Sequence, residues 1–285
     1  MDLIEKLYQS LLQQTKKNFE WLVVDDGSTD DTEKYFGKIS SKPQLFPIRY
    51  IKQENGGKHR AINKGVKSAS GDLFFIVDSD DYLTENAIDK INQWISTLDG
   101  SHKWAGISGL KGFSKQKIVG QRNSKKFIDA KNTERRKFHL EGDKAEVYFT
   151  DILKKYPFPE IPGENFISEE IVWNAIAREG YYLRWFNEII YICSYLECGL
   201  TKDNSKDERN PQGRLLWAKS QLESFPDDWR KRYSAIAIYY NAVCKRKKIK
   251  DIANNLGVSI FNVLLAKNIY NSFLLFYRLI SRKSF

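Results

Sequence analysis

Leu73-Phe74-Phe75-Ile76-Val77-Asp78-Ser79-Asp80-Asp81 is the stretch that decides the fold. Its five consecutive apolar residues are β-branched or aromatic enough to predict a short buried strand rather than a helix. The three carboxylates that follow repel one another and lose hydration unless a cation or a ligand hydroxyl compensates them. Oxygen ligands suit a hard divalent metal, Mg²⁺ or Mn²⁺, that takes its other ligands from water and a phosphate. The alternative is a solvated acidic turn.

A second stretch with the same order of features lies upstream, where the largely apolar residues 19–24 are followed by Asp25, Asp26 and Gly27. Because the carboxyl ends of parallel strands meet at one edge of a sheet, we expect the aspartates of the two stretches to form one acidic edge, where ligands bind. The first 80 residues alternate between helical and strand patterns, which predicts an α/β fold with a mostly parallel sheet flanked by helices. The helices are expected at 3–14, 32–40 and 58–68, and the strands at 19–24, 47–53 and 73–77.

The rest of the chain predicts further helices and strands, and then an all-helical region. We expect a polar loop over 111–137 and a linker over 197–210. Strands are expected at 104–110 and within 181–195, and helices at 83–98, 147–155, 169–178, 211–224, 226–247, 249–255 and 259–282.

Composition places the chain among ordinary globular proteins, with 41% hydrophobic and 29% charged residues over 285 positions. Three cysteines are too few for a disulfide framework, and we interpret Cys193 and Cys198 as core thiols in a reducing compartment. No signal peptide pattern and no apolar run of membrane-spanning length is present. These features predict a cytoplasmic location.

The positive charge is concentrated in the last 45 residues, which carry nine Lys or Arg and one acidic residue. An apolar and basic pattern over 261–285 favours an interfacial helix on an anionic leaflet, at the inner face of the plasma membrane. The alternative is a helix packed on the catalytic domain or on a second subunit of a homodimer. A pattern over 249–263 imitates a helix-turn-helix, but the segment after Ser259 has only Lys267 as a basic residue, so we expect no nucleic-acid binding.

Four motifs in this order resemble family 2 glycosyltransferases with the GT-A fold, especially bacterial enzymes that build capsular or exopolysaccharide. They are Asp25-Asp26-Gly27-Ser28, Asn55-Gly56-Gly57, Asp78-Ser79-Asp80-Asp81 and Glu169-Glu170. The run 164–169, Trp173 and the run 195–201 resemble one bacterial branch. The resemblance covers about residues 3–201, so we expect a catalytic domain over 1–200 and a basic helical region over 201–285.

The resemblance implies an inverting, metal-dependent transfer of a hexose or hexosamine from a UDP-sugar to a glycan or lipid-linked acceptor. Asp25 or Asp26 would hold the uracil or ribose, Asp78 would contact the ribose, and Asp80 would bind the Mn²⁺ or Mg²⁺ that bridges the phosphates. Ser79 and Lys58 complete the predicted nucleotide-binding set, although for Lys58 the residues themselves favour a solvated helix face.

The same resemblance implies a general base at the start of the 169–178 helix, which takes the proton from the acceptor hydroxyl. Glu169 matches the glutamate of the bacterial branch, and Glu170 matches the second acid of the wider family's pair. We favour Glu169. The alternative is that both residues merely favour the helix N-terminus electrostatically.

One departure from the family pattern lies at Met1, because relatives start with a strand and a short turn that cradles the nucleotide base. We expect the loss of that strand to weaken or abolish activity, whereas full activity without upstream residues would contradict this expectation. The alternative function is a degenerate, non-catalytic glycosyltransferase-like module, which UDP binding would distinguish from an enzyme.

Overall fold

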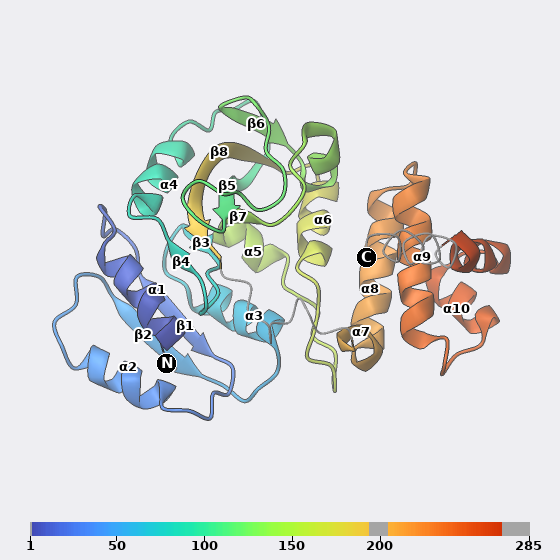
Figure 1. Cartoon of the computed structure of the whole chain (residues 1–285), viewed down its shortest axis with the longest axis horizontal. Helices are drawn as coiled ribbons and strands as arrows, with labels where there is room; N and C mark the ends of the chain where they lie inside the picture. Colours follow the sequence, from blue (N-terminus) through green and yellow to red (C-terminus); the bar gives the residue numbers. More distant parts are fainter. Residues whose placement is uncertain (1, 194–204, 270–285) are drawn as a thin grey trace, which may run out of the picture. The chain divides into compact units, whose positions relative to one another are not determined.

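The computed structural model describes residues 2–193 and 205–269 (Figure 1). The chain forms two compact units, one from Met1–Phe158 with Ile176–Gly199 and one from Pro159–Ala175 with Leu200–Phe285. The predicted α/β class, with helices flanking a sheet, is confirmed in the first unit. The functional division at residue 200 stays a prediction.

The first unit begins with the alternation that the sequence predicts. Its elements are α1 (Asp2–Leu12), β1 (Trp21–Asp25), α2 (Thr32–Ser40), β2 (Ile48–Lys52), α3 (Lys58–Ser68) and β3 (Leu73–Phe75). β1 and β2 form a parallel pair with Asp25 opposite Lys52. The carboxylates after β1 therefore lie at the carboxyl end of this small sheet, as the sequence predicts.

A second sheet contains six strands in the order β3-β7-β5-β8-β4, and β6 also pairs with β8. Its further strands are β4 (Tyr82–Leu83), β5 (Trp104–Gly112), β6 (Phe127–Ala130), β7 (Lys144–Phe149) and β8 (Tyr182–Ile192), with α4 (Ala87–Ile95) following β4. Among the described residues, β5 and β8 are the only neighbours that pair in parallel within this sheet. The sheet is thus mixed rather than mostly parallel. Local pattern locates a strand but does not give the direction of a partner distant in sequence.

Two predicted segments have a different structure. The expected loop over 111–137 contains β6 and most of the 3₁₀ helix η1 (Asn132–Phe138), and the expected helix over 147–155 begins as the end of β7 before α5 (Thr150–Lys155). Both errors have one cause: β6 and β7 are stabilised by pairing with β8 and β5, which are remote in sequence.

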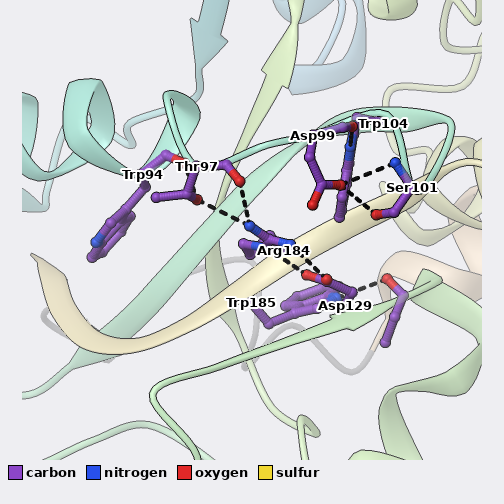
Figure 2. A network of polar contacts seen from close by, with 9 residues as sticks. Trp94, Thr97, Asp99, Ser101, Trp104, Asp129, Arg184 and Trp185 are labelled. Carbon is purple, nitrogen blue, oxygen red and sulfur yellow. Dashed lines mark hydrogen bonds and ion pairs between the residues drawn. The ribbon is translucent and has the colours of Figure 1, made fainter.

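A buried ion pair fixes β6 against β8 (Figure 2). Arg184 donates from Nε and Nη2 to the two carboxylate oxygens of Asp129, each at 2.7 Å, and from Nη1 to the Thr97 carbonyl at 2.6 Å. The Arg184 side chain is 7% exposed and its guanidinium stacks over the rings of Trp104 and Phe127. This bidentate pair holds a short strand that local pattern does not predict.

Helix α3 packs against both sheets. At Gly65, an added Cβ would lie 3.6 Å from Val24 of β1 and 3.3 Å from the Phe74 ring of β3. Trp21 of β1 and Leu73 and Phe75 of β3 also pack on one hydrophobic core. The apolar residues of β1 and β3 nevertheless remain only half-buried.

From residue 205 onward, the described part of the second unit is helical. It contains α7 (Lys206–Arg209), α8 (Pro211–Ser224), α9 (Trp229–Val243), α10 (Ile249–Leu256) and a helix over 260–269. Asp228 begins α9 by accepting hydrogen bonds from the backbone of Arg230 and Lys231, which shortens the helix expected over 226–247. Apolar residues of α8, α9, α10 and the last helix form a separate core.

Several sequence predictions lie partly or wholly outside the described residues. They are most of the expected linker over 197–210, the run 195–201 and the end of the basic helix after 269. Within 205–210 the structure has α7 instead of linker. None of the helices in the described ranges is both long and apolar enough to span a bilayer.

Candidate active site

Asp25, the last residue of β1, is a fixed carboxylate. It is buried, and its oxygens accept a hydrogen bond from the Ser28 amide at 2.7 Å and another from the Tyr50 hydroxyl on β2. Burial raises the pKa of Asp25, but the hydrogen bonds from Tyr50 and Ser28 outweigh it and hold the pKa below its usual value. Asp25 is therefore ionised at neutral pH.

Asp26 links the end of β1 to the start of α3. Its Oδ1 accepts hydrogen bonds from the Gly56 amide at 2.9 Å and the Gln53 side chain at 2.8 Å, and its Oδ2 accepts one from the Gly57 amide at 2.7 Å. Gly57 has a φ of 94°, a conformation that glycine adopts without strain. The Asp-Asp-Gly and Asn-Gly-Gly motifs thus belong to one contact in space.

Lys58, the first residue of α3, joins the contact around Asp26 to the acidic loop after β3. Its Nζ lies 2.5 Å from Oδ1 of Asp78, three residues beyond the end of β3. The structure therefore brings Asp26, Lys58 and Asp78 into one cluster within the first unit. Lys58 forms an ion pair here, and its side chain remains 38% exposed.

The acidic loop after β3 is held by Tyr191 of β8, a fully buried residue that the sequence analysis did not single out. The Tyr191 hydroxyl accepts a hydrogen bond from the Asp78 amide at 3.0 Å and donates one to Oδ2 of Asp81 at 2.7 Å. Its ring also contacts Phe75 edge to face. A tyrosine more than a hundred residues away in sequence gives no local signal of this role.

Two lysines counter the charge of this loop. Burial raises the pKa of Asp78, but the positive charges of Lys58 and Lys111 outweigh it, so that the pKa lies below its usual value. Burial and the charges of Asp78 and Asp81 raise the pKa of Tyr191, so that its hydroxyl stays protonated. The Asp78 carboxylate is therefore ionised, and the neutral phenol of Tyr191 lies between it and Asp81.

Asp80 is the carboxylate of the loop best suited to a metal. It is half-buried beside the exposed Ser79, and among the described residues it has no hydrogen bond or ion pair, whereas Asp78 and Asp81 are engaged by Lys58 and Tyr191. In the described ranges no three His, Cys, Asp or Glu side chains are grouped to hold an ion by themselves. One carboxylate nevertheless fits Mg²⁺ or Mn²⁺ when phosphate oxygens and waters complete the ligands.

Glu169 and Glu170 belong to the second unit, where α6 (Glu170–Arg178) begins. Both side chains are half-buried, and Glu170 accepts a hydrogen bond from the indole of Trp217 at 2.8 Å. The Glu169 carbonyl accepts hydrogen bonds from the amides of Val172 and Trp173, in the first turn of the helix. The glutamates are thus positioned by the start of α6 and by α8.

The run 164–169 has a structural role that its sequence did not reveal. The buried Glu164 accepts hydrogen bonds from the amides of Gln212 and Gly213 at 2.8 and 2.7 Å, in the first turn of α8. Asn210 accepts two more, from the amides of Asn165 and Phe166. A carboxylate at a helix N-terminus satisfies amides that have no partner within the helix. Glu164 therefore anchors the segment that carries Glu169.

Comparison with known proteins identifies the family. Residues 2–156 match the family described as glycosyl transferase family 2, which is more than half of the chain. The chain belongs to glycosyl transferase family 2, and all four aspartates of the predicted nucleotide site lie within the matched residues.

Similar proteins include glycosyltransferase GlyG of Streptococcus pneumoniae, which is 37% identical over 92 residues. That match covers 32% of this chain and 30% of GlyG, so the chain aligns with less than a third of this relative.

Solved structures confirm the GT-A fold. S. aureus TarS 1-349 in complex with UDP-GlcNAc superposes with a TM-score of 0.61 at 20% identity, over 86% of this chain and 69% of TarS. The mannosyltransferase PcManGT from Pyrobaculum calidifontis, in complex with GDP-Man and Mn²⁺, gives a TM-score of 0.51 at 17% identity, over 99% of this chain and 79% of that one.

Proposed function

We propose that this chain transfers a hexose or hexosamine from a UDP-sugar to a glycan acceptor, with Mn²⁺ or Mg²⁺ and with inversion at the anomeric carbon. The observation that carries the proposal is the cluster of Asp26, Asp78 and Asp80, which follow β1 and β3, with Lys58 at the start of α3. Membership of family 2 supports the transferase class. The TarS complex with UDP-GlcNAc supports a UDP-sugar as donor.

The acidic cluster suits a nucleotide diphosphate in several ways. Asp25 and Asp26 each keep acceptor capacity beyond the bonds they make within the chain, which supports a role toward the uracil or ribose. We assign Asp78, with Ser79 beside it, to a ribose hydroxyl, and Asp80 would hold the metal. A bound metal would supply charge neutralisation on the departing diphosphate. The Mn²⁺ of PcManGT is in line with this choice of metal.

For the general base we propose Glu169. The Trp217 indole already occupies one oxygen of Glu170, which supports a positioning role for that residue. The base takes the acceptor proton as the hydroxyl attacks the anomeric carbon, and the diphosphate leaves in the same displacement. Because no enzyme nucleophile takes part, this single displacement inverts the anomeric centre.

Calorimetric titration with UDP, in the presence and absence of Mn²⁺, tests the nucleotide site. We expect metal-dependent binding that Asp80→Asn loses and that the control Asp151→Asn keeps, because the Asp151 side chain is 86% exposed and pairs with Lys154. Binding without any subsequent transfer would favour the non-catalytic module. Absence of binding by the folded chain would contradict the proposed site.

A transfer assay, read as UDP release with a panel of glycan and lipid-linked acceptors, tests the base. Glu169→Gln should lower turnover by about 10²–10⁴-fold without changing UDP affinity, which is the usual contribution of general base catalysis. Glu170→Gln should have the smaller effect. The reverse order would assign the base to Glu170.

Contact with a membrane surface and formation of a homodimer remain predictions. Exposed apolar residues of the helix over 260–269, Phe261 and Leu264, are in line with an interface of either kind. Sedimentation of the chain with anionic vesicles and measurement of its mass in solution would distinguish the two.

A further inference from the structure

Lys111 is a cation beside the acidic loop that neither the predicted set of site residues nor the family motifs include. It is the penultimate residue of β5, where it lies opposite Tyr191 of β8 in the parallel ladder. The register shifts between Leu110 and Lys111, and such an irregularity turns side chains away from the regular alternation of a strand. The Lys111 ammonium lies 4.2 Å from the centre of the Tyr191 ring.

The contact with Tyr191 places this charge close to the acidic loop. The hydroxyl at the other end of the same ring contacts the Asp78 amide and the Asp81 carboxylate. The positive charge of Lys111 lowers the pKa of Asp78, although less than the charge of Lys58 does. Lys111 is thus a component of the cluster, on the side formed by β5 and β8.

The way in which Lys111 is held leaves its hydrogen-bond donors available. An ammonium over an aromatic face is attracted by the ring without donating to a carboxylate. Within the described ranges Lys111 forms no ion pair, whereas Lys58 is engaged by Asp78 at 2.5 Å. A half-buried ammonium with three donors is complementary to phosphate oxygens.

We propose that Lys111 binds the diphosphate of the nucleotide sugar and of the UDP product. This inference rests on the proposed function, since it names a further ligand for the same donor. Lys58 is already paired with Asp78, and Asp80 would hold the metal. Lys111 therefore supplies a positive charge that no carboxylate of the described residues engages in an ion pair. It stabilises the negative charge that grows on the leaving diphosphate as the glycosidic bond breaks.

The test is calorimetry of the full chain in Mn²⁺ with UDP and with uridine. Lys111→Met should weaken UDP binding at least about tenfold and leave uridine binding within twofold, and Lys111→Arg should keep most of the UDP affinity. The slope of log affinity against log salt for UDP should also decrease in Lys111→Met, because one ionic contact is lost. Lys117→Met is the matched control, because Lys117 lies over the Phe113 ring in the next hairpin.

Three results would overturn the inference. If Lys111→Met binds UDP as the wild type does, the proposed function stands and Lys111 has no part in it. If UDP and uridine weaken equally and the melting temperature falls, Lys111 only offsets the repulsion between the acids. If the wild-type chain itself binds no UDP, the proposed function fails and this inference fails with it.

Amine labelling of the wild-type chain gives a readout that does not depend on a variant folding. Saturating UDP with Mn²⁺ should lower the rate at which Lys111 is modified, as measured by peptide mass spectrometry, and should leave Lys117 unchanged. Equal modification of Lys111 with and without UDP would contradict the inference.

Discussion

Replacing Tyr191 by Phe removes one hydroxyl from the centre of the acidic loop, and the structure gives the size of the effect. The hydroxyl donates a hydrogen bond to the Asp81 carboxylate and accepts one from the Asp78 amide. A hydrogen bond to a charged group contributes about 1.5–3 kcal/mol, and an amide left without its acceptor adds to the loss. Because Asp81 keeps another partner, we expect a loss of about 2–3 kcal/mol in the free energy of unfolding.

For a compact unit of this size the loss corresponds to a melting temperature lower by about 4–12 °C, measured by circular dichroism. Tyr8→Phe is the matched control, because the Tyr8 hydroxyl donates to the neutral side chain of Gln44 at 3.0 Å. That change should cost only about 1 kcal/mol. The loosened loop should also lower metal-dependent UDP affinity about tenfold, if about half of the lost free energy must be regained on binding.

The reasoning is refuted if Tyr191→Phe has the same melting temperature as the wild type. It is also refuted if Tyr191→Phe loses no more free energy of unfolding than Tyr8→Phe does. A variant that is destabilised but binds UDP normally would show that Tyr191 supports the fold and does not position the carboxylates. The two readouts therefore separate stability from the organisation of the site.

Three further changes test the fold and its electrostatics. Asp129→Asn should destabilise the chain by about 3 kcal/mol, measured by urea unfolding, because Arg184 then stays buried without its counter-charge. Burial, followed by the charge of Arg135, lowers the pKa of Lys144 to about 8. The free energy of unfolding of the wild type should therefore rise between about pH 8 and 10, as the buried ammonium loses its proton. Lys144→Met should remove this rise. Gly106→Ala should prevent folding, as judged by circular dichroism, because the added Cβ would lie 2.0 Å from the Val147 carbonyl oxygen.

Each of these changes has its own control. Glu85→Gln breaks the exposed pair with Lys115 and should change stability by less than about 0.5 kcal/mol, and a cost equal to that of Asp129→Asn would contradict the argument from burial. If Lys144→Met keeps the full rise with pH, other groups cause it. Gly37→Ala, at a helical position with no neighbour near the new Cβ, should stabilise the chain by about 0.5–1 kcal/mol.

Much of the fold was predictable where local pattern and local structure agree. The alternation over the first 80 residues follows from short apolar runs and helical spacing, and each predicted element is present. The segments that were not predicted, β6 and β7, have weak local signals and gain their stability from partners remote in sequence. The same limitation left the direction of pairing in the second sheet unpredicted.

The candidate site shows a similar division. The carboxylates could be identified from the sequence because several acids after an apolar run are unusual. The structure places Asp26, Lys58 and Asp78 together. The roles of Tyr191 and Lys111 could not be predicted from the sequence, because a tyrosine and a lysine are common residues in strands. Their importance comes from a strand register that only the folded chain establishes.

The two separate sheets have a consequence for the behaviour of the protein in solution. In the described part of the chain β1 pairs only with β2, and β3 pairs only with β7, so each has one edge without a strand beside it. Unpaired edges of apolar strands are templates for strand addition between molecules. We expect the purified chain to self-associate as its concentration rises, and dilute solutions with moderate salt to be the conditions under which its ligand binding is best measured.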